Sequence, residues 1–199
     1  RSGLRAWQQQ ALELYTETSP RDFLAVATPG AGKTTFALVL ARRLLDARAV
    51  ERVVVVTPTD HLKSQWAEAA DGHDIDLITT FGRGTGLPRG VHGPALTYAG
   101  VAATTPALRA LVTGRRTLVI LDEIHHAGDS MSWGEAVREA FAPAERRLSL
   151  TGTPFRSDIN PIPFISYADD GDGGLRSRAD FSYGYGDALS DNTVRPVLF

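Results

Sequence analysis

The sequence contains no cysteine, so disulfide frameworks, thiolate zinc sites and cysteine nucleophiles are excluded together, and a reducing compartment is compatible with this composition. It also lacks an excess of charge of either sign. The 21 basic residues stand against 23 acidic residues, which gives a formal net charge of -2. Bulk charge therefore neither supports nor excludes a nucleic-acid partner, because a local basic patch can exist within a balanced total.

Long hydrophobic runs are absent as well. No apolar run approaches the roughly 18 to 20 residues that a membrane-spanning helix needs, and the first residues do not form a signal-peptide pattern. We therefore expect a cytoplasmic protein without a membrane partner. The chain has 199 residues, starts at Arg1 rather than Met, and stops at Phe199 inside the apolar run "VRPVLF", so we expect a fragment of a longer polypeptide.

What is present is a set of short apolar runs, rich in β-branched residues, that alternate with helical patterns. Hydrophobic residues make up 43% of the chain, enough for a substantial core. Continuous apolar strands that alternate with helices are typical of a parallel sheet buried on both faces. We therefore predict a doubly wound α/β fold, in one domain over residues 1–199. The expected strands lie in residues 23–28, 52–58, 74–79, 94–99, 117–123 and 146–154, and the expected helices in residues 33–47, 60–70 and 132–142.

Two segments have the composition of loops. Residues 81–94, "FGRGTGLPRGVHGP", are dense in glycine and proline, and residues 166–180, "SYADDGDGGLRSRAD", are acidic and then basic with few apolar side chains. In a doubly wound fold, binding residues gather where loops follow the carboxyl ends of strands. The motifs described next lie at such points.

The stretch "VATPGAGKTT", residues 26–35, has the pattern of a phosphate-binding loop, with Gly30 and Gly32 before Lys33. It follows an expected strand and opens an expected helix, which is the context that such a loop requires. Backbone N–H groups and the helix N-terminus would hold phosphates, Lys33 would reach the β- and γ-phosphates, and the Thr34 hydroxyl would bind magnesium. Ala27 replaces the usual first glycine, a mild change because that position needs a small residue. The nucleotide-binding residues expected here are Thr28, Pro29, Gly30, Ala31, Gly32, Lys33, Thr34 and Thr35.

A pair of carboxylates follows the expected strand "TLVIL". At that strand end Asp122 would lie across from the phosphate-binding loop and hold magnesium, while Glu123 would orient and deprotonate the attacking water. The alternative is that these residues cap the turn that follows. His125 and His126 also raise the alternative of a zinc site, although neither HExxH spacing nor a thiolate accompanies them.

Six segments, in order from Leu4 to Asp158, resemble the motifs of superfamily 2 helicases and translocases of the DEAD/DEAH-box type. "VATPGAGKTT" and "LDEIHH" are similar to motifs I and II, the Walker A and Walker B motifs. "LRAWQQQAL", about residues 4–12, resembles the glutamine motif, "VVTPTDHLKSQW" motif Ia, "ALTYAGVAA" the nucleic-acid-contacting segment after it, and "LTGTPFRSD" motif III. The forms "DEIH" and "TGTPFR" resemble the restriction-enzyme, repair-helicase and RNA-sensor branches rather than the DEAD-box RNA helicases.

The resemblance implies the first RecA-like ATPase domain of a helicase or translocase, with ATP and magnesium as cofactors. Gln8 would read the adenine edge, since an amide both donates and accepts hydrogen bonds, and Arg5 would pack beside the base. The alternative for Gln8 is an exposed helix position among three glutamines. The implied catalytic residues are Lys33, Asp122 and Glu123, and the implied metal ligands are Thr34 and Asp122.

Further roles follow from the same resemblance. It implies a nucleic-acid track held mostly by neutral groups, with DNA favoured over RNA. Plain turn and cap chemistry is the alternative for each residue of this track. The implied track residues are Thr57, Pro58, Thr59, Thr97 and Tyr98, and the implied residues that couple the γ-phosphate to the track are His125, Thr151, Gly152 and Thr153. Additional candidates for backbone or base contacts are Arg83, Arg89, Arg115, Arg116, Arg146 and Arg147, with solvation as the alternative, and Tyr183 and Tyr185, with packing as the alternative.

In this family a second RecA-like domain supplies arginine fingers that accelerate hydrolysis. No second domain with a phosphate site fits after Asp158, and residues of about 180–199 would lead toward it. We therefore expect these residues alone to bind nucleotide and to hydrolyse it slowly. The alternative function is a nucleotide-dependent switch or scaffold that recruits a protein partner and does not move on nucleic acid.

Overall fold

The computed structural model of the chain describes residues 3–82, 84, 86–157 and 161–184. Its centre is a seven-stranded sheet in the order β10-β1-β6-β5-β2-β4-β3, in which every neighbouring pair is parallel. The predicted doubly wound α/β fold is confirmed, with each expected strand in the sheet. The strands are β1 (Asp22–Ala27), β2 (Arg52–Thr57), β3 (Leu77–Ile78), β4 (Gly93–Thr97), β5 (Thr117–Leu121), β6 (Arg146–Thr151) and β10 (Phe181–Tyr183).

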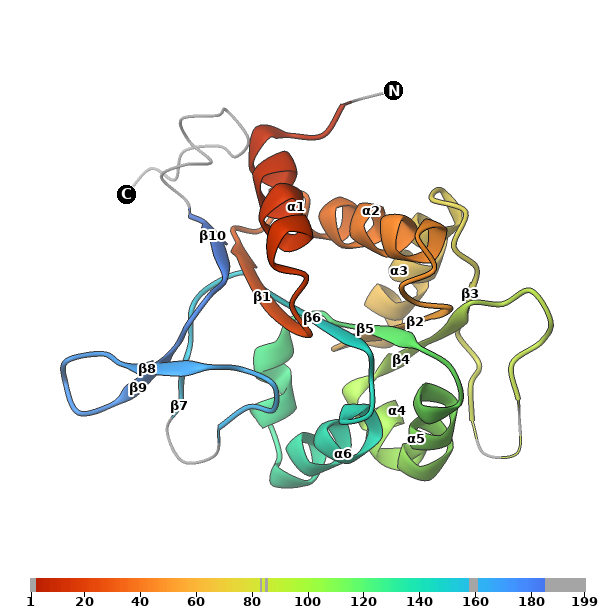
Figure 1. The fold of residues 1–199 in the computed structure, drawn as a ribbon. Helices are drawn as coiled ribbons and strands as arrows, with labels where there is room; N and C mark the ends of the chain where they lie inside the picture. Colours follow the sequence, from red (N-terminus) through yellow and green to blue (C-terminus); the bar gives the residue numbers. More distant parts are fainter. Residues whose placement is uncertain (1–2, 83, 85, 158–160, 185–199) are drawn as a thin grey trace.

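Helices cover both faces of this sheet (Figure 1). In the described part of the chain, three helices pack on one face, and three others pack on the opposite face together with a short 3-10 helix. The first face carries α1 (Ala6–Thr18), α2 (Lys33–Asp46) and α3 (Asp60–Asp71), and the second carries α4 (Tyr98–Ala103), α5 (Thr105–Gly114), η1 (Ile124–Gly128) and α6 (Met131–Phe141).

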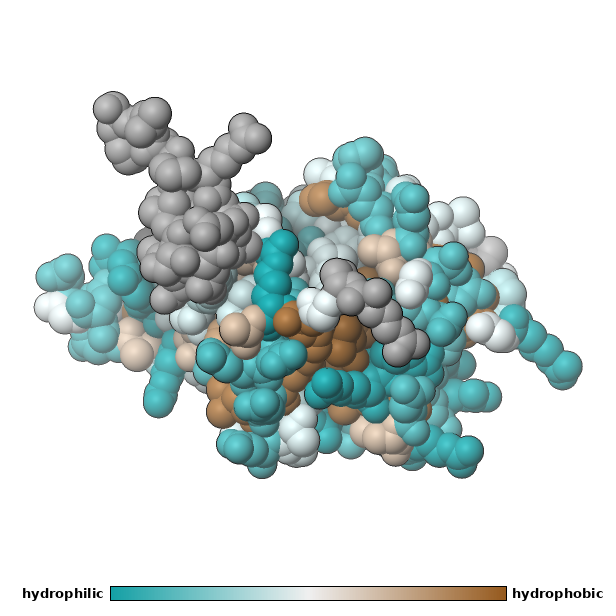
Figure 2. All heavy atoms as spheres, turned by 90° about the horizontal axis from the view of Figure 1, so that it is seen from above, coloured by the Kyte–Doolittle hydropathy of each residue, from teal (hydrophilic) through white to brown (hydrophobic). Residues whose placement is uncertain are grey.

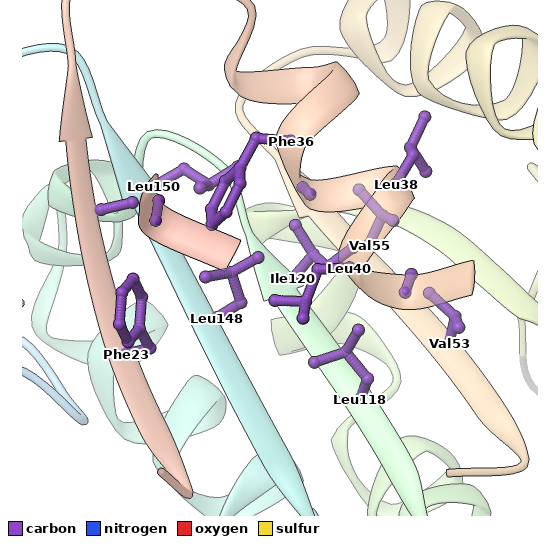
Figure 3. Packing of buried hydrophobic residues seen from close by; sticks show 14 of the residues in the cluster. Phe23, Phe36, Leu38, Leu40, Val53, Val55, Leu118, Ile120, Leu148 and Leu150 are labelled. Carbon is purple, nitrogen blue, oxygen red and sulfur yellow. The ribbon is translucent and has the colours of Figure 1, made fainter. Parts of the chain in front are cut away.

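The valine run of β2 shows why these strands read as continuously apolar. Val53 and Val55 join the hydrophobic cluster under α2, and Val54 and Val56 join the cluster under α4 to α6. Successive side chains of a strand point to opposite faces of the sheet, so a strand buried on both faces has no polar alternation. Figure 3 shows Val53 and Val55 beside residues of α2, with equivalent positions of the neighbouring strands in the same layer.

The edge strand β10 brings a late segment of the chain against α1. Tyr183 is 5% exposed, and its ring stacks on that of Trp7 with centroids 5.4 Å apart. The Tyr183 carbonyl oxygen accepts a hydrogen bond of 3.0 Å from the Thr28 N–H group. Packing is therefore the role of Tyr183, in place of base stacking, while Tyr185 lies outside the described residues.

The segment 166–180, expected to be a loop, instead forms most of a small antiparallel sheet, so that expectation is wrong. The sheet comprises β7 (Arg156–Ser157), β8 (Tyr167–Asp169) and β9 (Leu175–Ser177), in the order β7-β9-β8. The acidic and glycine-rich stretch is its hairpin turn, in which Asp170 Oδ1 accepts hydrogen bonds from the N–H groups of Asp172 and Gly174. Short strands with few apolar residues are hard to recognise in a sequence when turn-forming residues surround them. The hairpin projects from the main sheet (Figure 1).

The outer face that carries α1 and α2 is mainly hydrophilic, with hydrophobic side chains gathered near the centre of the view (Figure 2). Among the helices in the described part of the chain, none combines the length and the apolar character needed to cross a membrane.

The burial of Arg147 corrects its expected place among the arginines that contact nucleic acid. Arg147 is 7% exposed, and its Nε and Nη2 atoms lie 2.5 and 2.9 Å from the two carboxylate oxygens of Asp22. Such a side chain cannot line a nucleic-acid face, so Arg147 is structural. Arg146 is also occupied, since its Nη1 atom donates to the Pro20 carbonyl oxygen at 3.1 Å. Arg89, Arg115 and Arg116 are exposed, and Arg83 lies outside the described residues.

Candidate nucleotide-binding site

The carboxyl ends of β1, β6 and β5 are neighbours in the sheet. Val26 of β1 is in register with Thr151 of β6, and Ser149 of β6 with Leu121 of β5. The phosphate-binding loop, the "TGTP" stretch and the pair Asp122–Glu123 follow these strands directly. The sheet order therefore brings three motifs that are far apart in the sequence to one edge, as expected for a doubly wound fold.

The phosphate-binding loop turns through two left-handed glycines. Gly30 has φ 82° and Gly32 has φ 97°, and α2 begins at Lys33 immediately afterwards. Glycine adopts this backbone region without the steric cost of a Cβ atom. At Gly32 a Cβ atom would also lie 2.5 Å from Gln8 Nε2. The loop thus opens onto a helix N-terminus, where backbone N–H groups and the helix dipole favour an anion.

The start of α1 holds the outer side of this loop. Arg5 Nη1 donates a 2.9 Å hydrogen bond to the Gly30 carbonyl oxygen, and Gln8 Nε2 donates one of 2.9 Å to the Gly32 carbonyl oxygen. Trp7 Nε1 donates a 2.9 Å hydrogen bond to the Ala31 carbonyl oxygen between them. The C=O and N–H of a planar trans peptide point in opposite directions. The carbonyl groups of Ala31 and Gly32 face α1. The N–H groups in the same two peptide units, those of Gly32 and Lys33, therefore face away from α1.

Gln8 is 3% exposed, unlike the exposed position considered as its alternative. Its Oε1 atom accepts a 2.7 Å hydrogen bond from the Arg5 N–H group, while its Nε2 atom binds the Gly32 carbonyl. The side chain thereby joins the first turn of α1 to the phosphate-binding loop. Adenine recognition by Gln8 and Arg5 stays a prediction, and it would use the second lone pair and second N–H of the Gln8 amide.

A pocket of about 370 Å³ lies beside the loop. One wall comes from the loop and the start of α2, a second from the end of β5, and a third from α3. The residues of the third wall recur at i, i+3, i+4 and i+7, which is one face of a helix. The lining residues are Pro29, Gly30, Lys33, Thr34, Leu62, Gln65, Trp66, Ala69, Asp122 and Glu123.

Asp122 is fixed from several sides and is 7% exposed. Its Oδ2 atom accepts hydrogen bonds of 3.0 Å from both Thr57 Oγ1 and Trp66 Nε1. Burial raises the pKa of the Asp122 carboxyl group, and the hydrogen bond from Trp66, the charge of Lys33 and the hydrogen bond from Thr57 oppose that rise. The donors and the nearby ammonium group thus favour the carboxylate form that a divalent cation requires.

Glu123 occupies a left-handed backbone conformation, with φ 47° and ψ 56°. Non-glycine residues in this region carry strain of about 1–3 kcal/mol, and they cluster at functional sites. The Glu123 Oε1 atom accepts a hydrogen bond from Lys33 Nζ, and Oε2 lies 3.6 Å from His125 Nδ1. The strained backbone therefore supports a carboxylate that points at the phosphate-binding lysine.

The "TGTP" stretch, residues 151–154, lies beside both the phosphate-binding loop and the residues that follow β5. Thr151 Oγ1 lies 3.2 Å from His125 Nδ1 and donates a 3.1 Å hydrogen bond to the Thr153 carbonyl oxygen. At Gly152 a Cβ atom would lie 3.5 Å from the Pro29 side chain and 4.0 Å from Glu123 Oε1. The expected coupling residues are thus adjacent to the phosphate-binding loop and to Glu123.

The expected nucleic-acid contacts divide into two groups. Thr57 and Tyr98 are each 0% exposed, and the Tyr98 hydroxyl donates a 2.8 Å hydrogen bond to the Asp122 carbonyl oxygen. Their side chains therefore cannot meet a nucleic acid, which corrects that expectation; both hold Asp122. Thr59 and Thr97 cap α3 and α4 with their hydroxyl oxygens. Thr59 is exposed, and Pro58 and Thr97 are partly exposed.

The donor set of the pocket fits magnesium. Thr34 and Asp122 both line the pocket, so a hydroxyl and a carboxylate oxygen face the same space. Mg²⁺ prefers hard oxygen ligands and is usually bound through one or two protein groups together with waters and phosphate oxygens. Sequence reasoning found both of these residues, but it missed Leu62, Gln65, Trp66 and Ala69, although their helical spacing is visible in "HLKSQWAEA".

Comparison with known proteins gives one family. The sequence model of the family described as "Type III restriction enzyme, res subunit" matches residues 1–156. An uncharacterised protein of Mycobacterium tuberculosis strain H37Rv is 56% identical over 197 residues, which cover 98% of this chain and 33% of the relative. The chain thus spans about a third of the length of the curated relatives that it matches.

Solved structures share the fold at low sequence identity. A nuclease-deletion mutant of the Type ISP restriction-modification enzyme LlaGI, in complex with a DNA substrate mimic, has a TM-score of 0.68 at 17% identity, covering 96% of this chain and 21% of that chain. The Sulfolobus solfataricus SWI2/SNF2 ATPase core in complex with dsDNA has a TM-score of 0.61 at 17% identity, covering 76% of this chain and 32% of that chain.

Proposed function

The chain belongs to the family described as the res subunit of type III restriction enzymes, and from this premise we propose that it is an ATP-hydrolysing motor domain that moves on DNA. As the sequence resemblance implied, it is a superfamily 2 RecA-like domain. The observation that carries the proposal is that Lys33, Asp122 and Glu123 line one pocket beside the phosphate-binding loop. A phosphate-binding cation, a metal ligand and a general base are the groups that phosphoryl transfer to water needs.

Each of these residues has a separate task in the proposed reaction. The N–H groups at the start of α2 and the Lys33 ammonium group bind the phosphates of ATP. Thr34 and Asp122 would hold magnesium, which neutralises charge on the β- and γ-phosphates when bound. Glu123 orients the attacking water and accepts its proton, for which its carboxylate must first leave Lys33.

A track for nucleic acid fits the loops that follow β2 and β4. Thr57 and Thr97 are in register at the ends of these neighbouring strands. The exposed Thr59 and the partly exposed Pro58 and Thr97 therefore lie at one edge of the sheet. Neutral hydroxyl and backbone N–H groups bind phosphates without reading sequence. DNA is the proposed track because the similar LlaGI structure contains a DNA substrate mimic and the similar SWI2/SNF2 structure contains dsDNA.

Coupling between the two sites would run through the end of β6. His125 and Thr151 are 3.2 Å apart, and Gly152 lies against the phosphate-binding loop. We propose that a second RecA-like domain completes the site with an arginine, because a residue of this kind raises phosphoryl-transfer rates by about 10³–10⁵. Residues 1–199 alone are then expected to bind nucleotide and to hydrolyse it slowly.

Chemical labelling of lysine tests nucleotide binding directly. The chain has two lysines, Lys33 in the pocket and Lys63 on α3, with side chains that are 13% and 20% exposed. MgATP should protect Lys33 from acetylation, as read by mass spectrometry, while Lys63 serves as the internal control. Equal labelling of Lys33 with and without MgATP would contradict the proposal.

The motor is tested by a second measurement, the effect of nucleotide on DNA affinity. Fluorescence anisotropy of labelled duplex DNA should report different affinities with MgATP and without nucleotide, and Lys33→Ala should remove the difference. Nucleotide protection of Lys33 without any binding to DNA or RNA would favour a nucleotide-dependent switch instead.

A further inference from the structure

We propose that Trp66 is a positioning residue for the magnesium-binding carboxylate: with Thr57 it fixes Oδ2 of Asp122 and leaves Oδ1 for the metal. This inference rests on the proposed binding of MgATP. Trp66 Nε1 and Thr57 Oγ1 each lie 3.0 Å from that one oxygen atom. The two donors come from different elements, α3 and the end of β2, so they approach the carboxylate independently.

The backbone of Asp122 is held separately from its side chain. Its N–H group donates a 2.8 Å hydrogen bond to the Val56 carbonyl oxygen, and its carbonyl oxygen accepts the 2.8 Å hydrogen bond from the Tyr98 hydroxyl. These contacts fix where Asp122 lies, but they do not set the rotation of its carboxylate. That rotation is set by the two donors to Oδ2, and therefore by Trp66 and Thr57.

Core filling alone does not account for Trp66. The side chain is 3% exposed, yet it lines the pocket and directs its N–H group at a carboxylate. Trp7 offers a contrast within the same chain, because its N–H group binds a backbone carbonyl. A buried indole N–H needs a partner, and here the partner is a proposed metal ligand.

Magnesium is sensitive to this kind of support. It demands near-ideal octahedral geometry with ligands at about 2.0–2.1 Å. A carboxylate free to rotate would present either oxygen at varying angles, so the ion would lose a ligand of fixed direction. Groups that orient a metal ligand through hydrogen bonds typically change metal affinity by about 10–100-fold when mutated.

Titration with the fluorescent nucleotide mant-ATP tests the inference, in EDTA and at graded magnesium concentrations. Trp66→Phe keeps an aromatic ring and removes the N–H donor. Relative to its own affinity in EDTA, this variant should need at least about tenfold more magnesium than the wild type to reach the high-affinity state. Trp133→Phe is the matched control, because Trp133 lies on α6, outside the pocket, and it should titrate as the wild type does.

A second pair of variants tests the same oxygen atom without altering the indole. Thr57→Val removes the other donor at nearly constant volume and should also raise the magnesium requirement. Thr57→Ser retains a hydroxyl donor and should have the magnesium requirement of the wild type. Unchanged magnesium dependence in Trp66→Phe and Thr57→Val would overturn the inference and leave nucleotide binding intact. Wild-type protein that binds mant-ATP equally with and without magnesium would also overturn it. Absence of any mant-ATP binding would overturn the proposed function as well.

Discussion

Lys33 and Glu123 form an ion pair across the pocket, in which Lys33 Nζ donates a hydrogen bond to Glu123 Oε1. The two side chains are 13% and 25% exposed, so water screens the pair only partly. The ammonium group proposed to meet the β- and γ-phosphates is therefore bound to the carboxylate proposed to activate water. Incoming nucleotide has to compete with Glu123 for Lys33, and the same exchange would release the general base.

Glu123→Gln should consequently have opposite effects on binding and hydrolysis. Nucleotide affinity should rise by up to about tenfold, which corresponds to 1.4 kcal/mol, because the competing charge and its repulsion of the γ-phosphate are removed. ATP hydrolysis should fall by about 10²–10⁴-fold, the usual contribution of a general base. Mant-ATP titration and a phosphate-release assay measure the two quantities.

Glu139→Gln is the control for that variant, because Glu139 is exposed on α6. It should leave both nucleotide affinity and hydrolysis unchanged. Weaker nucleotide binding in Glu123→Gln would show that the ion pair supports the site instead of competing with the ligand.

The sequence was sufficient for six strands of the main sheet and for the phosphate-binding loop, because both depend on local composition. Runs such as "RVVVVT" are apolar at every position only if both faces of the sheet are covered, and Gly30, Gly32 and Lys33 follow a strand at fixed spacing. These features need no knowledge of which strands are neighbours. Local chemistry therefore predicted the fold class and six of the ten residues that line the pocket.

The environment of Asp122 could not be predicted in this way. Thr57 ends β2, Tyr98 follows β4, and both were expected to be accessible, but the order β5-β2-β4 places them beside Asp122. Trp66 reaches the same carboxylate only because α3 packs on that face of the sheet. Sequence spacing along one element does not reveal such contacts between elements. The hairpin of β8 and β9 was missed for another reason, since its turn chemistry resembles that of a loop.

Arg147 should contribute much more to stability than its ion-pair partner does. Its side chain is 7% exposed, whereas that of Asp22 is 40% exposed. Arg147 Nη1 also donates to the carbonyl oxygens of Phe141 and Ala142, at 3.0 and 2.9 Å, and the guanidinium group lies 4.0 Å from the centroid of the Phe164 ring. Arg147→Met would remove these donors, while the Phe141 carbonyl oxygen keeps the hydrogen bond from the Ala144 N–H group and the Ala142 carbonyl oxygen keeps that from Arg21 Nη2.

We expect Arg147→Met to lower the free energy of unfolding by about 2–4 kcal/mol, the scale for losing the hydrogen bonds of one buried charged side chain. Asp22→Asn should cost less than about 1 kcal/mol, because the exposed carboxylate contributes as a surface ion pair does. Urea unfolding followed by circular dichroism measures both values, with the exposed Arg138→Met as the control. Equal losses in Arg147→Met and Asp22→Asn would mean that the ion pair, and not the carbonyl contacts, carries the stability.

His92 links the chain segments that lead into β3 and β4, and this link should weaken in acid. The Asp76 N–H group donates a 2.9 Å hydrogen bond to His92 Nδ1, which requires that this nitrogen carry no proton. Burial lowers the pKa of His92 below its usual value, the charge of Arg42 lowers it further, and Asp76 opposes both effects. The folded protein therefore binds a proton at His92 less readily than the unfolded chain does.

The direction of the pH effect follows from this difference. Above the unfolded pKa of about 6.5 His92 is neutral in both states and its contribution to stability is complete. As the pH falls below that value the unfolded chain gains the proton first, so stability is lost until the folded pKa is passed. Urea unfolding between pH 8 and pH 5 should show a steeper loss in the wild type than in His92→Gln, which cannot titrate. His125 also has a lowered pKa but is present in both proteins, so parallel curves would exclude the contribution of His92.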